Sequence, residues 1–161
     1  MRACYPGHEG FVERGGVPLH REICGAGERT IFFLPTWSII HSRIWKMQIP
    51  YFARYLRVLT LDGRGNGTSG RPQGAASYDD REIVADALAI MDATATERAT
   101  LVCECHATVQ VLIATAVHPS RWGRVSRSLC ASASPSPRDA GERGSVQPAG
   151  TRRGVCQCHG R

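Results

Sequence analysis

Three short apolar runs constrain the fold of this chain more than any other feature. Residues 30–34, 57–61 and 99–103 consist mainly of large or β-branched side chains, and Arg57 is the one charged residue among them. Strands that are buried on both faces have continuous apolar runs, whereas strands with one face in water alternate. The three runs therefore predict a parallel sheet that is covered by helices on both faces.

The segments between these runs have the periodicity of helices, with apolar side chains three or four residues apart. The helical segments are residues 42–55, 80–93 and 106–117. Pro50 divides the first segment or starts a new turn in it, and Asp79 is placed to cap the second. Residues 11–24 suit a hairpin around a turn at 14–16. The predicted fold class is α/β, with an antiparallel start, parallel strands after it and helices on both faces.

The composition excludes several classes of protein. The chain has 161 residues, 42% of them hydrophobic and 21% charged, which is enough for one domain with a core. No apolar run is long enough to cross a bilayer and none stands at the start, so we expect no membrane contact and a cytoplasmic location. The net charge of +6 is concentrated beyond residue 125, and no basic stripe with interleaved aromatic residues precedes it. We therefore expect no nucleic-acid partner.

The last 36 residues differ from the rest of the chain. Residues 126–161 are rich in Ser, Arg, Gly, Ala and Pro, and have only Leu129, Val146 and Val155 as large aliphatic residues. Such a segment cannot bury enough apolar surface to order itself. We expect one domain over residues 1–125 and a disordered basic tail over 126–161, which is either natural or the product of out-of-frame translation of a GC-rich gene.

Several motifs follow the apolar runs in a recognisable order. Residues 34–37 read L-P-T-W, residues 62–69 read D-G-R-G-N-G-T-S, and residues 118–121 read H-P-S-R. In this order and spacing, residues 11–125 resemble the N-terminal part of the α/β-hydrolase superfamily, of the fold-1 type. The D-x-R-G-x-G-x-S turn is the most specific of these matches. The resemblance implies a hydrolase that acts on a small-molecule substrate of the ester or lactone type, without a cofactor.

The resemblance also assigns a nucleophile. In this superfamily the nucleophile stands on a sharp strand-to-helix elbow, G-x-S-x-G, and the following amide helps to form the oxyanion hole. The corresponding residues 103–107 read C-E-C-H-A, which puts Cys105 in the nucleophile position. Dienelactone-hydrolase-like members use cysteine there, and a helix N-terminus lowers the pKa of a thiol. The backbone amides of Trp37 and His106 are the implied oxyanion donors. The alternative is that Cys105 is a buried, inert residue of a degraded elbow.

The acid and the base of the triad have no convincing candidates. The superfamily order is nucleophile, acid, histidine, each after a later strand. Asp139 and His159 lie in the predicted tail, and His41 suits the surface or a helix cap. We assign no catalytic base, and we expect a truncated chain that is inactive or weakly active alone.

A non-catalytic protein is the main alternative to the hydrolase, and metal binding and cofactor binding are weaker ones. The chain could be a non-catalytic fragment or interaction module, and an incomplete sheet would then associate with itself through its exposed edge. Residues 103–106 and 156–159 both read C-x-C-H, but this spacing is tighter than that of most zinc sites, so no metal ligand is assigned. Residues 65–70 match G-x-G-x-x-G, yet the next helix is predicted only near residue 80. We therefore assign no cofactor-binding residue.

Overall fold

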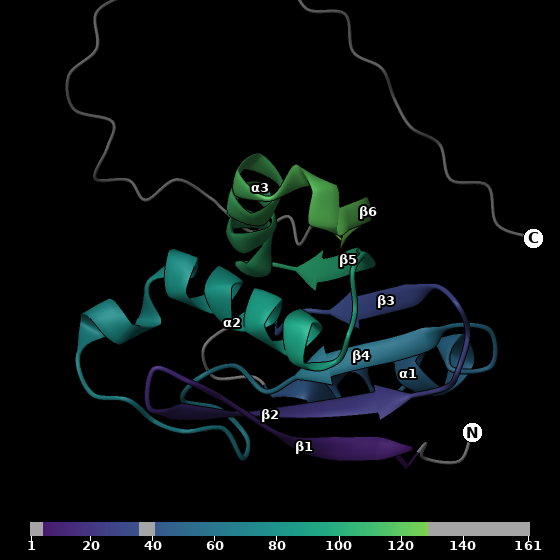
Figure 1. The fold of residues 1–161 in the computed structure, drawn as a ribbon, viewed down its shortest axis with the longest axis horizontal. Helices are drawn as coiled ribbons and strands as arrows, with labels where there is room; N and C mark the ends of the chain where they lie inside the picture. The colour runs from purple at the N-terminus through teal and green to yellow at the C-terminus, as the bar shows by residue number, and fades with distance from the viewer. Residues whose placement is uncertain (1–4, 36–40, 129–161) are drawn as a thin grey trace, which may run out of the picture. The chain divides into compact units, whose positions relative to one another are not determined.

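The computed structural model describes residues 5–35 and 41–128, and its core is a six-stranded mixed sheet (Figure 1). The strands are β1 (His8–Arg14), β2 (Val17–Cys24), β3 (Thr30–Phe33), β4 (Arg57–Leu61), β5 (Ala99–Glu104) and β6 (Trp122–Ser128). Their order across the sheet is β1-β2-β4-β3-β5-β6. β2 pairs antiparallel with both β1 and β4, and the remaining pairs are parallel. The predicted fold class is confirmed.

Helices cover both faces of the sheet, as Figure 1 shows. One face carries α2 (Asp80–Ala93) and α3 (Ala107–Val117), and the other carries η1 (Ser42–Trp45) and α1 (Gln48–Phe52). Phe32 packs in the core under α2 and α3, whereas its neighbour Phe33 packs against Trp45 of η1. Consecutive residues of one strand thus fill two cores, which explains why the run is apolar throughout.

The local signals of the sequence are largely borne out. α2 spans the predicted residues 80–93, and the Asp79 side chain accepts a hydrogen bond from the Arg81 amide at 2.8 Å. The segment 42–55 is divided into η1 and α1, with Pro50 in the first turn of α1, where a missing N–H costs little. Gly15 and Gly16 both have positive φ, as a two-residue hairpin turn requires.

The sequence did not predict the sixth strand. β6 follows the short helix η3 (Pro119–Arg121), pairs in parallel with β5, and crosses the expected boundary at residue 125. Its sequence, W-G-R-V-S-R-S, has two large apolar residues, which is too few for a strand buried on both faces. β6 is the last strand of the described sheet, and an edge strand needs less apolar surface. The expected tail from residue 129 onward lies outside the described residues.

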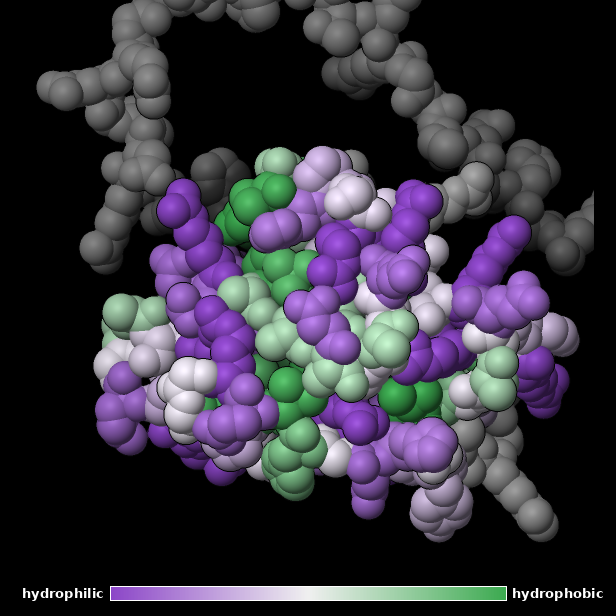
Figure 2. All heavy atoms as spheres, in the orientation of Figure 1, coloured by the Kyte–Doolittle hydropathy of each residue, from purple (hydrophilic) through white to green (hydrophobic). Residues whose placement is uncertain are grey.

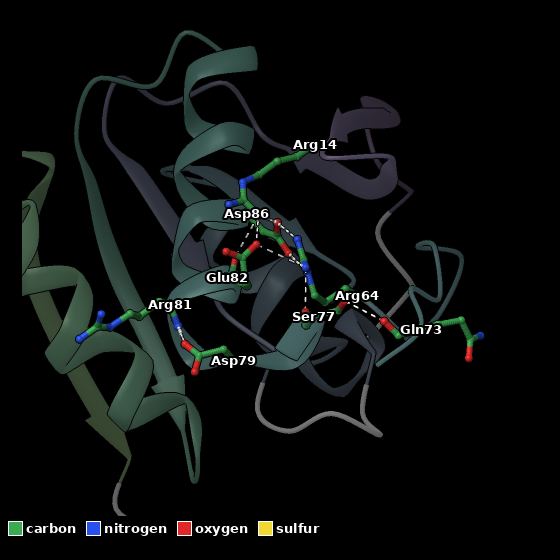
Figure 3. A network of polar contacts seen from close by, with 8 residues as sticks. All are labelled: Arg14, Arg64, Gln73, Ser77, Asp79, Arg81, Glu82 and Asp86. Atoms are coloured by element: carbon green, nitrogen blue, oxygen red, sulfur yellow. Dashed lines mark hydrogen bonds and ion pairs between the residues drawn. The ribbon is translucent and has the colours of Figure 1, made fainter. Parts of the chain in front are cut away.

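A buried ionic network ties the turn after β4 to α2 and to the hairpin (Figure 3). Arg64 donates to both carboxylate oxygens of Asp86 at 2.6 Å, and Arg14 reaches the same carboxylate at 2.9 Å. Asp86 is fully buried and Arg64 is 5% exposed. Arg14 also donates to Glu82, and this hydrogen bond lowers the pKa of Glu82 and raises that of Arg14. The network holds the glycine-rich turn in place.

Among the described residues, no helix is both long enough and apolar enough to cross a membrane.

We expect the substitution Asp86→Ala to destabilise the fold strongly, because the only carboxylate contact that the buried Arg64 guanidinium then keeps is the longer one with the partly exposed Glu82, at 3.6 Å. Losing one partner of a buried ion pair costs about 3–5 kcal/mol. The matched control is Asp92→Ala on the same helix, whose carboxylate pairs with Arg121 at 2.7 Å but is 64% exposed. That change should cost at most about 1 kcal/mol. Urea unfolding followed by circular dichroism measures both, and equal losses would contradict the assigned role of the network.

Candidate active site

The carboxyl ends of the parallel strands meet at one edge of the sheet, where α/β proteins bind their ligands. Beyond β3, the Leu34 amide donates to the Val102 carbonyl at 3.0 Å, and its own carbonyl accepts from the Trp45 indole at 3.2 Å. Asp62 follows β4 and Cys105 follows β5. The segments that follow β3, β4 and β5 contain the motifs that the sequence analysis singled out. They therefore begin side by side.

The D-G-R-G turn is built around the carboxylate of Asp62. Its Oδ1 accepts from the Ser42 amide at 2.9 Å and its Oδ2 from the Thr68 amide at 3.2 Å. Burial alone would raise the pKa of Asp62, but these hydrogen bonds outweigh it and the pKa is lowered. Asp62 is buried, and so is Ser69, whose hydroxyl donates to the Asp62 carbonyl at 2.6 Å. The turn shapes the edge of the site and offers no exposed acid.

The glycines of this turn fill a structural need. A Cβ on Gly65 would lie 2.8 Å from the Tyr78 ring, and Gly65 has φ +84. The dinucleotide fingerprint needs a helix that opens directly from the loop. Here the short helix η2 (Ala75–Tyr78) intervenes and α2 begins at Asp80, as the sequence predicted. The loop therefore lacks the helix that would hold a pyrophosphate.

Cys105 stands on a sharp turn between β5 and α3. Its φ is +54, a left-handed backbone conformation that residues other than glycine rarely adopt. Cys105 is exposed, whereas the flanking Cys103 and Ala107 are fully buried. The small flanking residues pack inward while the turn holds residue 105 outward. The alternative that Cys105 is buried does not hold, since the side chain is accessible to solvent.

His106 directly precedes α3 and makes a contact that the sequence did not reveal. Its Nε2 lies 3.0 Å from Oδ1 of Asp80, and Gln110 donates to the same oxygen at 3.2 Å. Asp80 is the first residue of α2, so the contact joins the starts of two neighbouring helices. Nothing in the local pattern signals it, because the pair is 26 residues apart and depends on the packing of α2 against α3.

The remaining candidates lie elsewhere or outside the described residues. His41 precedes η1 and its Nδ1 accepts from the Arg43 amide at 3.2 Å, which confirms the predicted cap. Trp37, the second expected oxyanion donor, lies outside the described residues, as do Asp139, His159 and the second C-x-C-H segment.

Comparisons with known proteins agree with this geometry. Epoxide hydrolase A of Mycobacterium tuberculosis is 35% identical over 119 residues, which cover 73% of this chain and 37% of that protein. An epoxide hydrolase variant from Vigna radiata shares the fold with a TM-score of 0.69 at 24% identity, over 76% of this chain and 39% of that one. Epoxide Hydrolase A from Mycobacterium thermoresistibile shares the fold with a TM-score of 0.68 at 26% identity, over 76% of this chain and 39% of that one. No protein-family model matches the chain. The chain thus spans well under half the length of these relatives.

The strained backbone at Cys105 leads to a test with two variants. We expect Cys105→Gly to be more stable than Cys105→Ala by about 1 kcal/mol, because glycine adopts a left-handed φ without the steric cost that a Cβ brings. Thermal and urea unfolding measure the difference. In the interior of α2, Ala89→Gly should lower stability by a similar amount, since glycine is a poor helix former. If the glycine variant at 105 is no more stable than the alanine variant, the elbow stores no strain.

Proposed function

Because the chain belongs to the α/β-hydrolase superfamily, we propose that it is an acyl hydrolase whose nucleophile is the thiolate of Cys105. The single observation that carries this proposal is the exposed, left-handed Cys105 at the turn from β5 into α3. Residues with strained backbone conformations cluster at active sites, where the strain is part of the mechanism. A hydrolase of this superfamily takes a small-molecule substrate, and esters and lactones are acyl compounds that a thiol nucleophile can turn over.

The chemistry proceeds in two halves. The thiolate attacks the carbonyl carbon of an ester, and the electron pair moves to the carbonyl oxygen. When this pair returns, a thioester forms and the alkoxide leaves, taking a proton from water to become the alcohol. Water then attacks the thioester carbon, releasing the carboxylic acid and restoring the thiol. The backbone amide of His106 at the start of α3 is suited to hold the oxyanion, and the loop that contains Trp37 would supply the second amide.

The second half of the reaction needs a base that reaches the attacking water. Among residues 5–35 and 41–128 we assign none. His106 contacts Asp80, His41 caps η1, and His20 on β2 lies beside Asp62. His8 starts β1, and His118 follows the last residue of α3, at the other end of that helix from Cys105. We therefore propose that the chain alone acylates once and turns over slowly or not at all.

The relatives named epoxide hydrolases make an epoxide the obvious competing substrate. A thiolate that opens an epoxide forms a carbon–sulfur bond, and the ring oxygen takes up a proton. The resulting thioether has no carbonyl carbon for water to attack, so the enzyme is left alkylated. Thioester formation is reversible by hydrolysis and thioether formation is not. The residue at position 105 therefore favours acyl substrates over epoxides for turnover.

The decisive experiment is a burst assay with p-nitrophenyl acetate, with the modified residue located by peptide mass mapping. We expect release of about one p-nitrophenolate per chain and an acetyl group on the peptide that carries Cys105. Cys105→Ala should abolish this burst, and Cys24→Ala, which removes a buried thiol, should leave it unchanged.

An aryl epoxide provides the second arm of the experiment. It should add permanently to Cys105, block the burst and yield no diol. Labelling spread evenly over the cysteines, or a burst that survives Cys105→Ala, would refute the nucleophile. Steady formation of diol would refute the preference for acyl substrates.

We also propose that the chain associates with a second copy of itself through the β6 side of the sheet. β6 ends the described sheet, and the neighbouring α3 exposes Val109, Leu112 and Val117 by 43, 56 and 61%. Figure 2 shows hydrophobic residues gathered over α3 and toward α2. An apolar surface beside a strand edge favours pairing with another chain.

Size-exclusion chromatography with light scattering tests this association. The wild type should run as a dimer or larger species at micromolar concentration, and Leu112→Lys should shift it toward the monomer by placing a charge on the apolar surface. Tyr51→Lys introduces the same charge on α1, on the opposite face of the sheet, and should have no effect. A wild type that stays monomeric, or equal effects of the two variants, would rule out this surface.

A further inference from the structure

We propose that Glu9, His20 and Glu22, on the outer hairpin of the sheet, form a binding site for a divalent transition-metal ion of the Zn²⁺ class. Their ligand atoms, one imidazole nitrogen and two carboxylate oxygens, all lie within 4.8 Å of one another. Imidazole and carboxylate groups are ordinary Zn²⁺ ligands, and three of them leave a fourth position for water. The site is separate from Cys105 and does not depend on the proposed hydrolysis.

The hairpin register brings these residues together. Glu9 of β1 stands directly opposite Glu22 of β2, and His20 is two residues before Glu22 on the same strand. Side chains two apart on a strand point to the same face, and directly opposed residues share a face as well. The three donors therefore converge on one side of a rigid two-stranded ladder, an arrangement that needs no loop to hold it.

The charges of the cluster favour a cation. Two carboxylates directly opposite each other repel, which destabilises a hairpin unless a positive charge lies between them. Glu22 is also buried, at 6% exposure, so its charge is poorly screened by water. Arg43 approaches Oε1 of Glu22 at 3.4 Å, but its side chain is 62% exposed and this contact is long. Among the described residues no other cation pairs with Glu22 or Glu9, so the second oxygen of Glu22 and the Glu9 carboxylate are available to the ion.

A third carboxylate lies behind His20. The Nδ1 atom of His20 is buried, has no hydrogen-bond partner among the described residues, and lies 3.5 Å from Oδ2 of Asp62. The ring also packs against Phe11, with centroids 5.3 Å apart. Metal-bound histidines commonly donate a hydrogen bond from the second ring N–H to a carboxylate, which fixes the ring and its tautomer. Asp62 is placed to accept such a hydrogen bond from Nδ1–H when the metal binds, which leaves Nε2 as the ligand atom.

The experiment titrates Co²⁺, a spectroscopic substitute for Zn²⁺, into the full chain with its thiols reduced. We expect visible ligand-field bands of a nitrogen- and oxygen-ligated ion, without the near-ultraviolet charge-transfer band that cysteine thiolates would add. Zn²⁺ should displace the Co²⁺. The Glu9→Gln variant removes an exposed ligand without disturbing the core, and should weaken binding by about tenfold or more.

Glu13→Gln is the matched control, because Glu13 is an exposed residue on the same strand and the same face, opposite Pro18 instead of a ligand. This variant should bind Co²⁺ as the wild type does. Equal affinities of the two variants would overturn the proposal, since a general charge effect would then explain the binding. Absence of the visible bands, or a spectrum that consists of thiolate charge transfer, would overturn it as well.

Discussion

The buried contact between Arg64 and Asp86 is the constraint on which the rest of the structure depends. Two opposite charges are removed from water here, and each is tolerated because of the other. Arg64 belongs to the turn after β4 and Asp86 to the middle of α2, while Arg14 brings the end of β1 to the same carboxylate. Turn, helix and hairpin are thus fixed together. Because Asp80 at the start of α2 also contacts His106, the constraint extends to the elbow after β5.

The turn at Cys105 is one of two places among the described residues where a residue other than glycine has a positive φ, and Ala95 after α2 is the other. A left-handed conformation at Cys105 is unfavourable for any residue with a Cβ, so the surroundings must impose it. The fully buried Cys103 and Ala107 anchor the two sides of the turn, one at the end of β5 and the other at the start of α3. Their small size lets strand and helix approach closely. What matters at these positions is the absence of bulk, which explains why the turn keeps its shape with both glycines replaced.

Sequence reasoning succeeded wherever a local pattern carried the information. Continuous apolar runs located the three central strands, and a cap with helical periodicity located α2 (Asp80–Ala93). It failed for β6, whose stability comes from pairing with β5 and not from its own composition. It also missed the contact of His106 with Asp80, which depends on how two helices pack. It also missed the cluster of Glu9, His20 and Glu22, because the predicted hairpin began at residue 11 and the register that opposes Glu9 to Glu22 comes from the structure.

The relation between the relatives and the chemistry of this chain follows from one side chain. Proteins that share a fold have the elbow, the turn and the sheet in common. The residue at the elbow determines which atom can attack the substrate. Sulfur forms a hydrolysable bond with an acyl carbon and a permanent one with the carbon of an epoxide. If Cys105 is the nucleophile, as proposed, its bond to an acyl group can be hydrolysed and its bond to an opened epoxide cannot. The substrate class has to be argued from Cys105, and the fold alone cannot supply it.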